Sequence, residues 1–306
     1  MKWAVIGSNS FSGNAFVEYL QAKYSENVIR IERPNYDLNR DMLAIINAIS
    51  NADYVVNFAA LSMVAQSWEY PEAWVRTNTM SLASLARGLL GSKTLKRFVQ
   101  ISTPEVYGSG GYKLMDESQP MNPSTPYAVS RAAGDMMLSA YHKAYGFPVV
   151  TTRTVNVYGV GQQLYRIIPK TILCILKGEK LILDGGGVSS RQFIHINDVA
   201  EATYMTALWG NVGDVYHSSI YEHLTIARLV SLICRRMGVA FDDVVTVGPE
   251  RAGKDNNYHL SSDKLRALTG WSPSVNLGAG LNGVIEWMKR DFETLSKRPS
   301  TYIFKE

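Results

Sequence analysis

Tyr127 and Arg131 are the first residues in the sequence whose types and spacing point to chemistry. Residues four positions apart share one face of a helix, so a cation at 131 can stabilise the phenolate form of Tyr127. That brings the phenol towards a pKa useful for general-base catalysis. Thr103, at the expected end of a strand, is placed to hydrogen-bond the substrate oxygen from which Tyr127 would take a proton. A simpler interpretation of Tyr127, which follows Pro126, is that it caps and packs the start of a helix.

Gly7 and Gly13 bracket a second motif, which follows an apolar run at 3–6 and opens a helix. Glycines there allow a tight turn and a close approach of the backbone to a pyrophosphate, which then lies at the positive end of the helix dipole. Ser10 stands where a middle glycine is usual. The motif alone is a weak signal, because such joints occur in many α/β proteins that bind no nucleotide.

Glu32 comes just after the second expected strand, where a carboxylate can accept hydrogen bonds from both hydroxyls of an adenosine ribose. It would also repel a 2′-phosphate, which favours NAD over NADP. Arg33 argues the other way, since an arginine can accept that phosphate. Both residues could also simply belong to a solvated turn.

Short apolar and β-branched runs alternate with helix-period segments in the first half of the chain, which predicts βαβ units. The expected strands are 3–6, 28–31, 54–57, 97–101 and 149–152. The expected helices between them are 11–23, 41–49, 72–90 and 127–145. The predicted fold class is therefore α/β, with a doubly wound parallel (Rossmann) sheet whose ligands bind beyond the carboxyl ends of the strands.

The second half of the chain predicts a smaller α/β lobe. Its expected helices and strands are 167–177, 180–183, 191–196, 225–238, 244–247, 261–269 and 277–290. A helix at 198–209 and a strand at 214–218 could return to the first sheet. We therefore expect residues 1–165 with 198–220 to form a dinucleotide-binding domain, and 166–197 with 221–306 to form a substrate-binding lobe. Residues after Leu295 are expected to be loosely held.

Two segments together resemble a known active site: residues 102–108, Ser-Thr-Pro-Glu-Val-Tyr-Gly, and residues 127–131, Tyr-Ala-Val-Ser-Arg. They resemble the extended short-chain dehydrogenase/reductases of the NAD-dependent epimerase/dehydratase family, and look most like its nucleotide-sugar 4,6-dehydratases. The resemblance covers essentially the whole chain. Further matches at the family's spacing lie at 37–38, 57–60, 77–78, 153–159, 168–169, 191–199 and 270–273.

The resemblance implies that NAD is reduced and then regenerated in each turnover. Tyr127 would take the proton of the sugar 4-hydroxyl while NAD takes the hydride from C4. The resulting ketone acidifies the C5 proton, which Glu105 would remove, and loss of the C6 hydroxyl gives an enone. Hydride return to C6 then leaves a 4-keto-6-deoxy sugar. The implied catalytic residues are Thr103, Glu105, Tyr127 and Arg131. Taken singly, Glu105 could be an ordinary surface carboxylate.

The resemblance also implies two sets of binding residues. For NAD they are Gly7, Ser10, Phe11, Ser12, Gly13, Glu32, Asp37, Leu38, Phe58, Ala59, Ala60, Asn78, Ser102, Tyr127 and Arg131. For the nucleotide-sugar substrate they are Thr103, Asn156, Tyr165, Arg166, Arg191 and Arg251. The forked guanidinium of arginine matches phosphate oxygens, although these arginines could instead form surface ion pairs. The base of the nucleotide stays open.

Three departures from the family pattern bear on activity. Arg131 stands where lysine is usual, and arginine keeps the charge without being interchangeable with an ammonium. Pro104 stands where dTDP-glucose dehydratases have an acid, so Glu105 would act first as base and then as acid. Ser10 replaces a glycine.

Other functions remain open on these residues. A decarboxylase of a nucleotide-linked uronic acid shares the segment around Glu105, and a 4-epimerase is less favoured because it has no use for a C5 base. A catalytically degenerate nucleotide-binding homologue would explain the three departures. It would bind nucleotide without turnover.

The bulk properties favour a cytoplasmic enzyme. The net charge of +4 and 19% charged residues give no basic stripe for nucleic acid. Cys174 and Cys234 lie in apolar helical patterns, which indicates reduced thiols. No apolar run approaches the ~18 residues of a membrane span. The five histidines lack metal-ligand spacing. By resemblance we expect a homodimer that pairs through helices 72–90 and 127–145.

Overall fold

A six-stranded parallel sheet forms the centre of the computed structural model, which describes residues 1–111, 113–250, 253, 255 and 257–304. The strand order is β11-β6-β4-β3-β1-β2. The strands are β1 (Lys2–Ile6), β2 (Asn27–Ile31), β3 (Tyr54–Asn57), β4 (Arg97–Ser102), β6 (Val149–Thr154) and β11 (Val215–Ser218). The doubly wound sheet is confirmed, and the strand expected at 214–218 does return to it beside β6.

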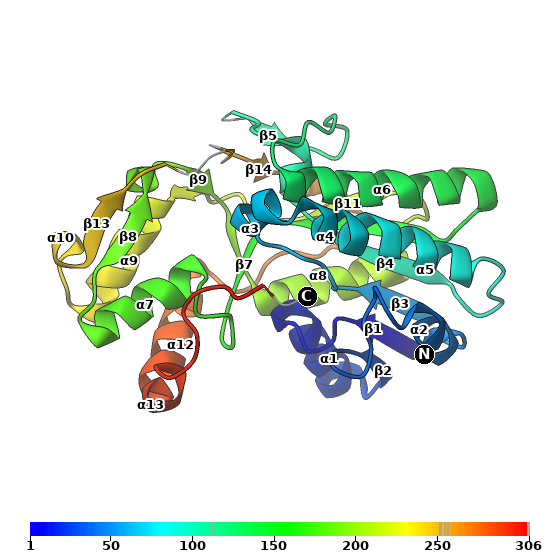
Figure 1. Ribbon diagram of the computed structural model, residues 1–306, viewed down its shortest axis with the longest axis horizontal. Coiled ribbons are helices and arrows are strands. Elements are labelled where there is room, and N and C mark those ends of the chain that lie inside the picture. The colour runs from blue at the N-terminus through cyan, green and yellow to red at the C-terminus, as the bar shows by residue number, and fades with distance from the viewer. Residues whose placement is uncertain (112, 251–252, 254, 256, 305–306) are drawn as a thin grey trace.

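Alternate side chains of each strand enter two separate cores, because successive residues point to opposite faces of a sheet. Trp3 and Val5 pack beneath α1 (Phe11–Tyr24) and α8 (Ile196–Trp209). Ala4 and Ile6 pack on the other face, which is covered by helices α2, α5 and α6. Their bounds are Met42–Ile49, Ser81–Leu89 and Pro126–Tyr145. Figure 1 shows α6 and α5 above the sheet and α1 below it.

The helix expected at 72–90 is interrupted. The chain forms α3 (Val64–Glu69) and α4 (Pro71–Val75), then one π-helical stretch, Arg76–Met80, before α5. Within that stretch Asn78 exchanges hydrogen bonds with the backbone of Leu61, and Thr79 donates to the Ser130 carbonyl. Buried polar side chains that must find partners account for the widened turn.

The second lobe contains helices α7 (Ile167–Lys177), α9 (Ile226–Met237) and α12 (Leu277–Arg290), of which α7 packs against the other two, and a short parallel pair of strands. That pair is β8 (Leu181–Asp184) with β13 (Val245–Gly248). The remaining described elements are β5 (Leu114–Met115), β7 (Asn156–Tyr158), β12 (Leu224–Thr225), β14 (His259–Leu260), α10 (Phe241–Val244), α11 (Asp263–Thr269), α13 (Phe292–Leu295) and the short 3-10 turns Pro104–Tyr107 and Gly185–Gly187.

The strand expected at 191–196 is divided in two. Strand β9 (Ser190–Arg191) pairs with β12, and β10 (Phe193–His195) pairs with β7. Gln192, between them, is fully buried, and its side chain bonds the backbone of Ile220 and Leu260. These side-chain bonds fix the place where the chain changes partners.

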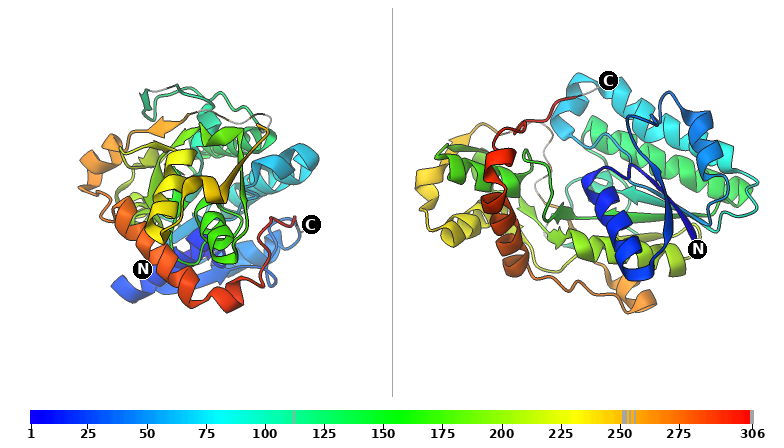
Figure 2. Two further views of the ribbon diagram at one scale, coloured as in Figure 1. Left: turned by 90° about the vertical axis from the view of Figure 1, so that its left-hand side faces the viewer. Right: turned by 90° about the horizontal axis from the view of Figure 1, so that it is seen from below.

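Within the described residues after Leu295, Tyr302 and Phe304 each contact another aromatic ring, which differs from the expectation that this segment is loosely held. The segment leaves α13 and runs back to the first half of the chain, where Phe304 stacks on Tyr70 at 4.8 Å. Figures 1 and 2 show this red segment leaving α12 and α13 and reaching the region of α3 and α4. No helix in the described part of the chain is long and apolar enough to span a membrane.

Candidate active site

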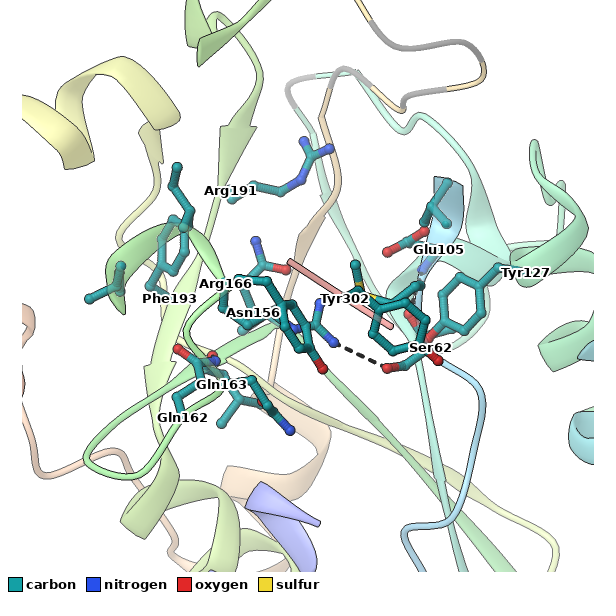
Figure 3. Close-up of a pocket in the computed structure, with 18 of the residues that line it drawn as sticks. Ser62, Glu105, Tyr127, Asn156, Gln162, Gln163, Arg166, Arg191, Phe193 and Tyr302 are labelled. Atoms are coloured by element: carbon teal, nitrogen blue, oxygen red, sulfur yellow. Dashed lines mark hydrogen bonds between the residues drawn. The ribbon is translucent and has the colours of Figure 1, made fainter. Parts of the chain in front are cut away.

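One cavity of about 880 Å³ lies beyond the carboxyl ends of the central strands and extends under the second lobe. Its wall combines residues from both halves of the chain. Those predicted as site residues are Ser10, Phe11, Ser12, Phe58, Ala60, Ser102, Thr103, Glu105, Tyr127, Asn156, Tyr165, Arg166 and Arg191. Figure 3 shows Glu105 and Tyr127 on one side of the cavity and Phe193 on the other, with Arg166 and Asn156 between them. The volume is within the range of cofactor and ligand sites.

Thr103 and Glu105 are presented by a turn that Pro104 starts. Thr103 has an extended backbone, as a residue before proline must, and its Oγ1 accepts a hydrogen bond from the Glu105 backbone N at 3.3 Å. Proline suits the first position of a helical turn because it lacks the N–H that would have no partner there. Pro104 therefore removes an acid from the site and stiffens the turn that carries Glu105.

Tyr127 is buried in the first turn of α6, which Thr125 caps by accepting from the Ala128 N. Burial raises the pKa of the Tyr127 phenol, and the nearby Glu105 carboxylate also raises it. The Arg131 guanidinium and a hydrogen bond with Thr103 act in the opposite direction. The net pKa is raised, so the cation acts as expected but does not outweigh burial.

Arg131 is buried behind Tyr127 and does not line the cavity. Its Nη2 donates to the Ile101 carbonyl at the end of β4. This bond fixes the guanidinium beside the strand that carries Ser102 and Thr103. The forked side chain is thus accommodated by a backbone acceptor.

The loop after β1 is shaped for close packing. A side chain at Gly7 (φ +76°) would place its Cβ 2.8 Å from the Ala59 N, and one at Gly13 would place it 2.2 Å from the Gly7 carbonyl oxygen. Ser10 is the N-cap of α1, where its Oγ accepts from the Gly13 N at 3.1 Å. The departure at Ser10 therefore stabilises the start of α1, the helix that is expected to receive the pyrophosphate. The glycine cradle and the helix N-terminus fit an NAD molecule.

Glu32 and Arg33 lie at the end of β2, and each has a partner. Ser8 Oγ donates to Glu32 at 2.6 Å. Arg33 pairs with Asp37 at 2.5 Å, which places the Asp37 carboxylate on the cation that would otherwise attract a 2′-phosphate. The arrangement is consistent with NAD.

Three predicted cofactor residues lie behind the cavity wall. Ala59 packs under Gly7, Leu38 packs on the core below α2, and Asn78 holds the loop at Leu61. They shape the wall without lining it. Gly7, Gly13, Glu32 and Asp37 also stand outside the lining.

On the substrate side, Tyr258 organises two predicted residues. Its Oη donates to Asn156 Oδ1 at 3.1 Å, and the Arg191 guanidinium lies 4.2 Å from its ring centre. Burial raises the pKa of Tyr258 while Arg191 lowers it. Arg166 donates to Ser62 Oγ at 3.1 Å. The predicted Arg251 lies outside the described residues.

Tyr258 and Tyr302 line the cavity but were not predicted. Tyr258 comes from a polar stretch without periodicity, so no pattern marks it. Tyr302 and Phe304 stand two positions apart, a strand-like alternation of aromatic residues that could have indicated a docked segment. Among the described residues, no group of three or more His, Cys, Asp or Glu could hold a metal ion.

A buried polar chain lies behind the active site. Ser102 Oγ donates to Asp135 at 2.7 Å, and Asp135 pairs with Arg153 at 2.9 Å. Arg153 also donates to the Tyr107 hydroxyl, which lies 2.8 Å from His217 Nε2. The chain connects the end of β4 to β11, so it couples the catalytic strand to the edge of the sheet.

The chain is similar to known proteins over most of its length. Residues 3–218 match the model of the NAD dependent epimerase/dehydratase family. A dTDP-glucose 4,6-dehydratase of Streptomyces niveus is 35% identical over 274 residues, which cover 87% of this chain and 81% of that protein. A low-salt glycan biosynthesis protein of Haloferax volcanii is 30% identical over 309 residues, covering 94% and 99%. A solved dTDP-glucose 4,6-dehydratase of Streptomyces venezuelae with NAD bound has a TM-score of 0.90 at 26% identity and covers 96% of this chain and 98% of its own.

The fold and the site define a Rossmann-type enzyme that uses NAD. The chain belongs to the NAD dependent epimerase/dehydratase family. The predicted family, fold class and cofactor are confirmed. The predicted enzyme function, a nucleotide-sugar 4,6-dehydratase, is likewise that of relatives matching most of the chain.

Proposed function

We propose that this protein oxidises a nucleotide-linked hexose at C4, eliminates water across C5 and C6, and returns the hydride to C6. The observation that carries the proposal is the convergence of Thr103, Glu105 and Tyr127 at one end of a cavity whose wall also contains the dinucleotide loop, residues 10–12. A base, a hydroxyl and a carboxylate at the strand ends are what this reaction requires.

Tyr127 takes the proton of the sugar 4-hydroxyl, and Thr103 hydrogen-bonds the same oxygen. Arg131, fixed on the Ile101 carbonyl, favours the phenolate from behind. NAD, when bound, would supply the hydride chemistry, in which the hydride taken from C4 is the one returned to C6. The residues that would hold NAD are those of the glycine cradle, Glu32 and the wall at Phe58 and Ala60.

Glu105 removes the C5 proton once C4 is a ketone. The same carboxyl group then delivers that proton to the departing C6 hydroxyl, which leaves as water. This double role follows from Pro104, which supplies no acid in the described turn. Glu105 and Tyr127 line the same cavity, which supports a position of the Glu105 carboxylate beside C5 and C6 of the sugar.

Asn156, Arg166 and Arg191 are proposed to bind the diphosphate, with Tyr165 beside the sugar or base. All four line the cavity, and Figure 3 shows Asn156 and Arg166 between Glu105 and Phe193, which supports this division of roles. Because several relatives are dTDP-glucose 4,6-dehydratases, dTDP-glucose is the first substrate to test.

The test is an incubation of the purified protein with NAD and, separately, dTDP-, UDP-, GDP- and CDP-hexoses, followed by mass spectrometry. Loss of one water that depends on Glu105 supports the proposal and identifies the nucleotide. Loss of carbon dioxide from a uronic acid would assign a decarboxylase. No mass change despite NAD binding would assign a non-catalytic binding protein.

We also propose a homodimer formed through the neighbouring helices α4–α5 and α6. Exposed apolar side chains on these elements support a second copy as the partner; they are Val75, Met80, Val129, Met136 and Met137. Light scattering tests it: Met136→Glu should shift the protein towards a monomer, whereas Leu43→Glu on α2, also exposed, should not. A monomeric parent protein at micromolar concentration contradicts the proposal.

We propose, finally, that residues 1–165 with 198–220 form the NAD-binding domain and 166–197 with 221–306 the nucleotide-sugar lobe. Separate apolar clusters beneath each part support the division. The stretch containing Leu265 and Trp271 packs against α8 and β11, so it forms the contact between the two parts. A cytoplasmic location is supported by Cys174 and Cys234, which are both free and buried.

A further inference from the structure

The segment 301–304 has the geometry of an extended strap. Thr301 and Ile303 are exposed, whereas Tyr302 and Phe304 are partly buried. A period of two is that of an extended chain, so Tyr302 and Phe304 point to the same side. That side faces the protein, and each ring has found an aromatic partner there.

Phe304 fixes the strap to the first half of the chain. Its ring stacks on Tyr70 at 4.8 Å and lies 5.4 Å from the ring of Trp74, which is fully buried. The strap starts from the second lobe, after α13, and runs to the first half of the chain (Figure 2), and its Tyr302 lines the active-site cavity on the way.

Tyr302 lies at the part of the strap that borders the active-site cavity. It lines the same cavity as residues 10–12 and Phe58, which belong to the dinucleotide side. Its ring meets Tyr165 edge-on at 5.5 Å, and Figure 3 shows it near the hydrogen bond that joins Arg166 to Ser62. Burial raises the pKa of the Tyr302 phenol, whereas the charge of Arg33, at the expected adenosine end of the cofactor site, lowers it.

We propose that the segment 301–304 is a strap that retains NAD between turnovers, with Tyr302 covering the bound dinucleotide and Phe304 holding the strap shut. The proposed reaction explains why retention is useful, because each turnover returns the cofactor to its starting oxidation state. Only the sugar nucleotide must exchange. A cofactor that need not dissociate between turnovers can be covered by a segment that is anchored to both parts of the chain.

The test measures release of the reduced cofactor, NADH, by its fluorescence after mixing the loaded protein with excess NAD. Sugar nucleotide is left out, so the result does not depend on whether the proposed dehydration occurs. The variants are Tyr302→Ala and Phe304→Ala, with Ile303→Ala as the matched control because this side chain points to solvent. Phe304 is the sharper probe, because it anchors the strap without lining the cavity.

Release should be roughly tenfold faster in Tyr302→Ala and Phe304→Ala, and unchanged in Ile303→Ala. Phe304→Tyr, which keeps an aromatic ring on Tyr70 and Trp74, should restore slow release. Equal release rates in the parent, Tyr302→Ala and Phe304→Ala would overturn the proposal. A raised KM for the sugar nucleotide with unaltered NADH release would also overturn it, because the strap would then cover the substrate. Thermal unfolding of each variant separates these outcomes from loss of the fold.

Discussion

Burial and charge act in opposite directions on the phenol of Tyr127. Burial favours the protonated phenol and raises its pKa, whereas Arg131 favours the phenolate. The arginine is held on the Ile101 carbonyl, so its charge stays fixed behind the ring. The pKa of a buried base of this kind depends strongly on nearby cations, of which Arg131 has a larger effect than Arg166.

Replacement of Arg131 tests that dependence. Arg131→Met removes the influence that lowers the pKa of Tyr127, so the acidic limb of the pH–rate profile should move to higher pH. Arg131→Lys keeps the charge and should move it less. The readout is cofactor reduction in a single turnover across a pH series. Identical profiles for Arg131→Met and the parent would show that Tyr127 does not titrate as the base.

Replacement of Tyr127 and Glu105 should stop the reaction at different points. Tyr127→Phe should slow cofactor reduction by roughly 10²–10⁴-fold, as expected for loss of a general base. Glu105→Gln should still reduce the cofactor but slow water loss by a similar factor, so reduced cofactor should accumulate. Absorbance and product mass report the two steps. Simultaneous loss of both steps in Glu105→Gln would contradict the assigned role.

Chemistry-bearing residues were more predictable than those that complete the cavity. The spacing of four between Tyr127 and Arg131 predicts that the two side chains share one face of a helix. The position of Thr103 after an apolar run predicts that it lies at the end of a strand. Tyr258 and Tyr302 reach the cavity through tertiary packing, from a polar stretch and from beyond the last long helix. No local sequence pattern predicts that these two tyrosines line the cavity.

Among the elements, α1 shows why a departure from a motif need not weaken a site. Ser10 caps the helix by accepting a hydrogen bond from the Gly13 N. It thereby satisfies one of the backbone N–H groups that have no acceptor within the first turn of a helix. A glycine in its place would leave the turn looser and the donor free.

Ser10→Ala should cost about 1 kcal/mol of unfolding free energy, and Ser10→Gly only a few tenths. Urea unfolding measures both. NAD titration of the same variants should show weaker binding in Ser10→Ala, because the helix start is less ordered. Unaltered stability in Ser10→Ala would mean that the cap is not formed in solution.

Element types were predicted correctly for the central sheet, while two boundaries were not. The helix at 72–90 follows an apolar period, yet Asn78 and Thr79 need partners on Leu61 and Ser130, and a π-helical stretch provides the geometry. The strand expected at 191–196 has no break in its sequence, yet buried Gln192 divides it. In both places a buried polar side chain overrode the local pattern.

At the scale of the whole molecule, His217 makes stability depend on pH. Burial, together with Arg153, lowers its pKa to about 3 from an ordinary value of 6.5. Below about pH 6.5 the unfolded chain binds a proton at this histidine and the folded chain does not. The free energy of unfolding is therefore highest above about pH 6.5 and decreases as the pH falls below it. The slope from one such group is at most roughly 1.4 kcal/mol per pH unit.

His217→Gln should therefore flatten the loss of stability between about pH 6.5 and pH 5, although it should lower stability at neutral pH by disturbing Tyr107 and Ser261. Burial raises the pKa of the neighbouring Glu117, which opposes the slope in both proteins. The readout is thus the difference between variant and parent in urea unfolding at each pH. Parallel curves would show that His217 is protonated equally in both states.

The place of β11 has a consequence for how the chain is made. This edge strand pairs with β6, although residues 155–214 lie between them and include the first part of the second lobe, residues 166–197. During synthesis the edge of β6 therefore stays open until the chain has passed residue 218, and closing so long a loop is slow. An open strand edge is a template for association with other chains. The nascent protein is thus most exposed to aggregation in that interval, when the sheet waits for its last strand.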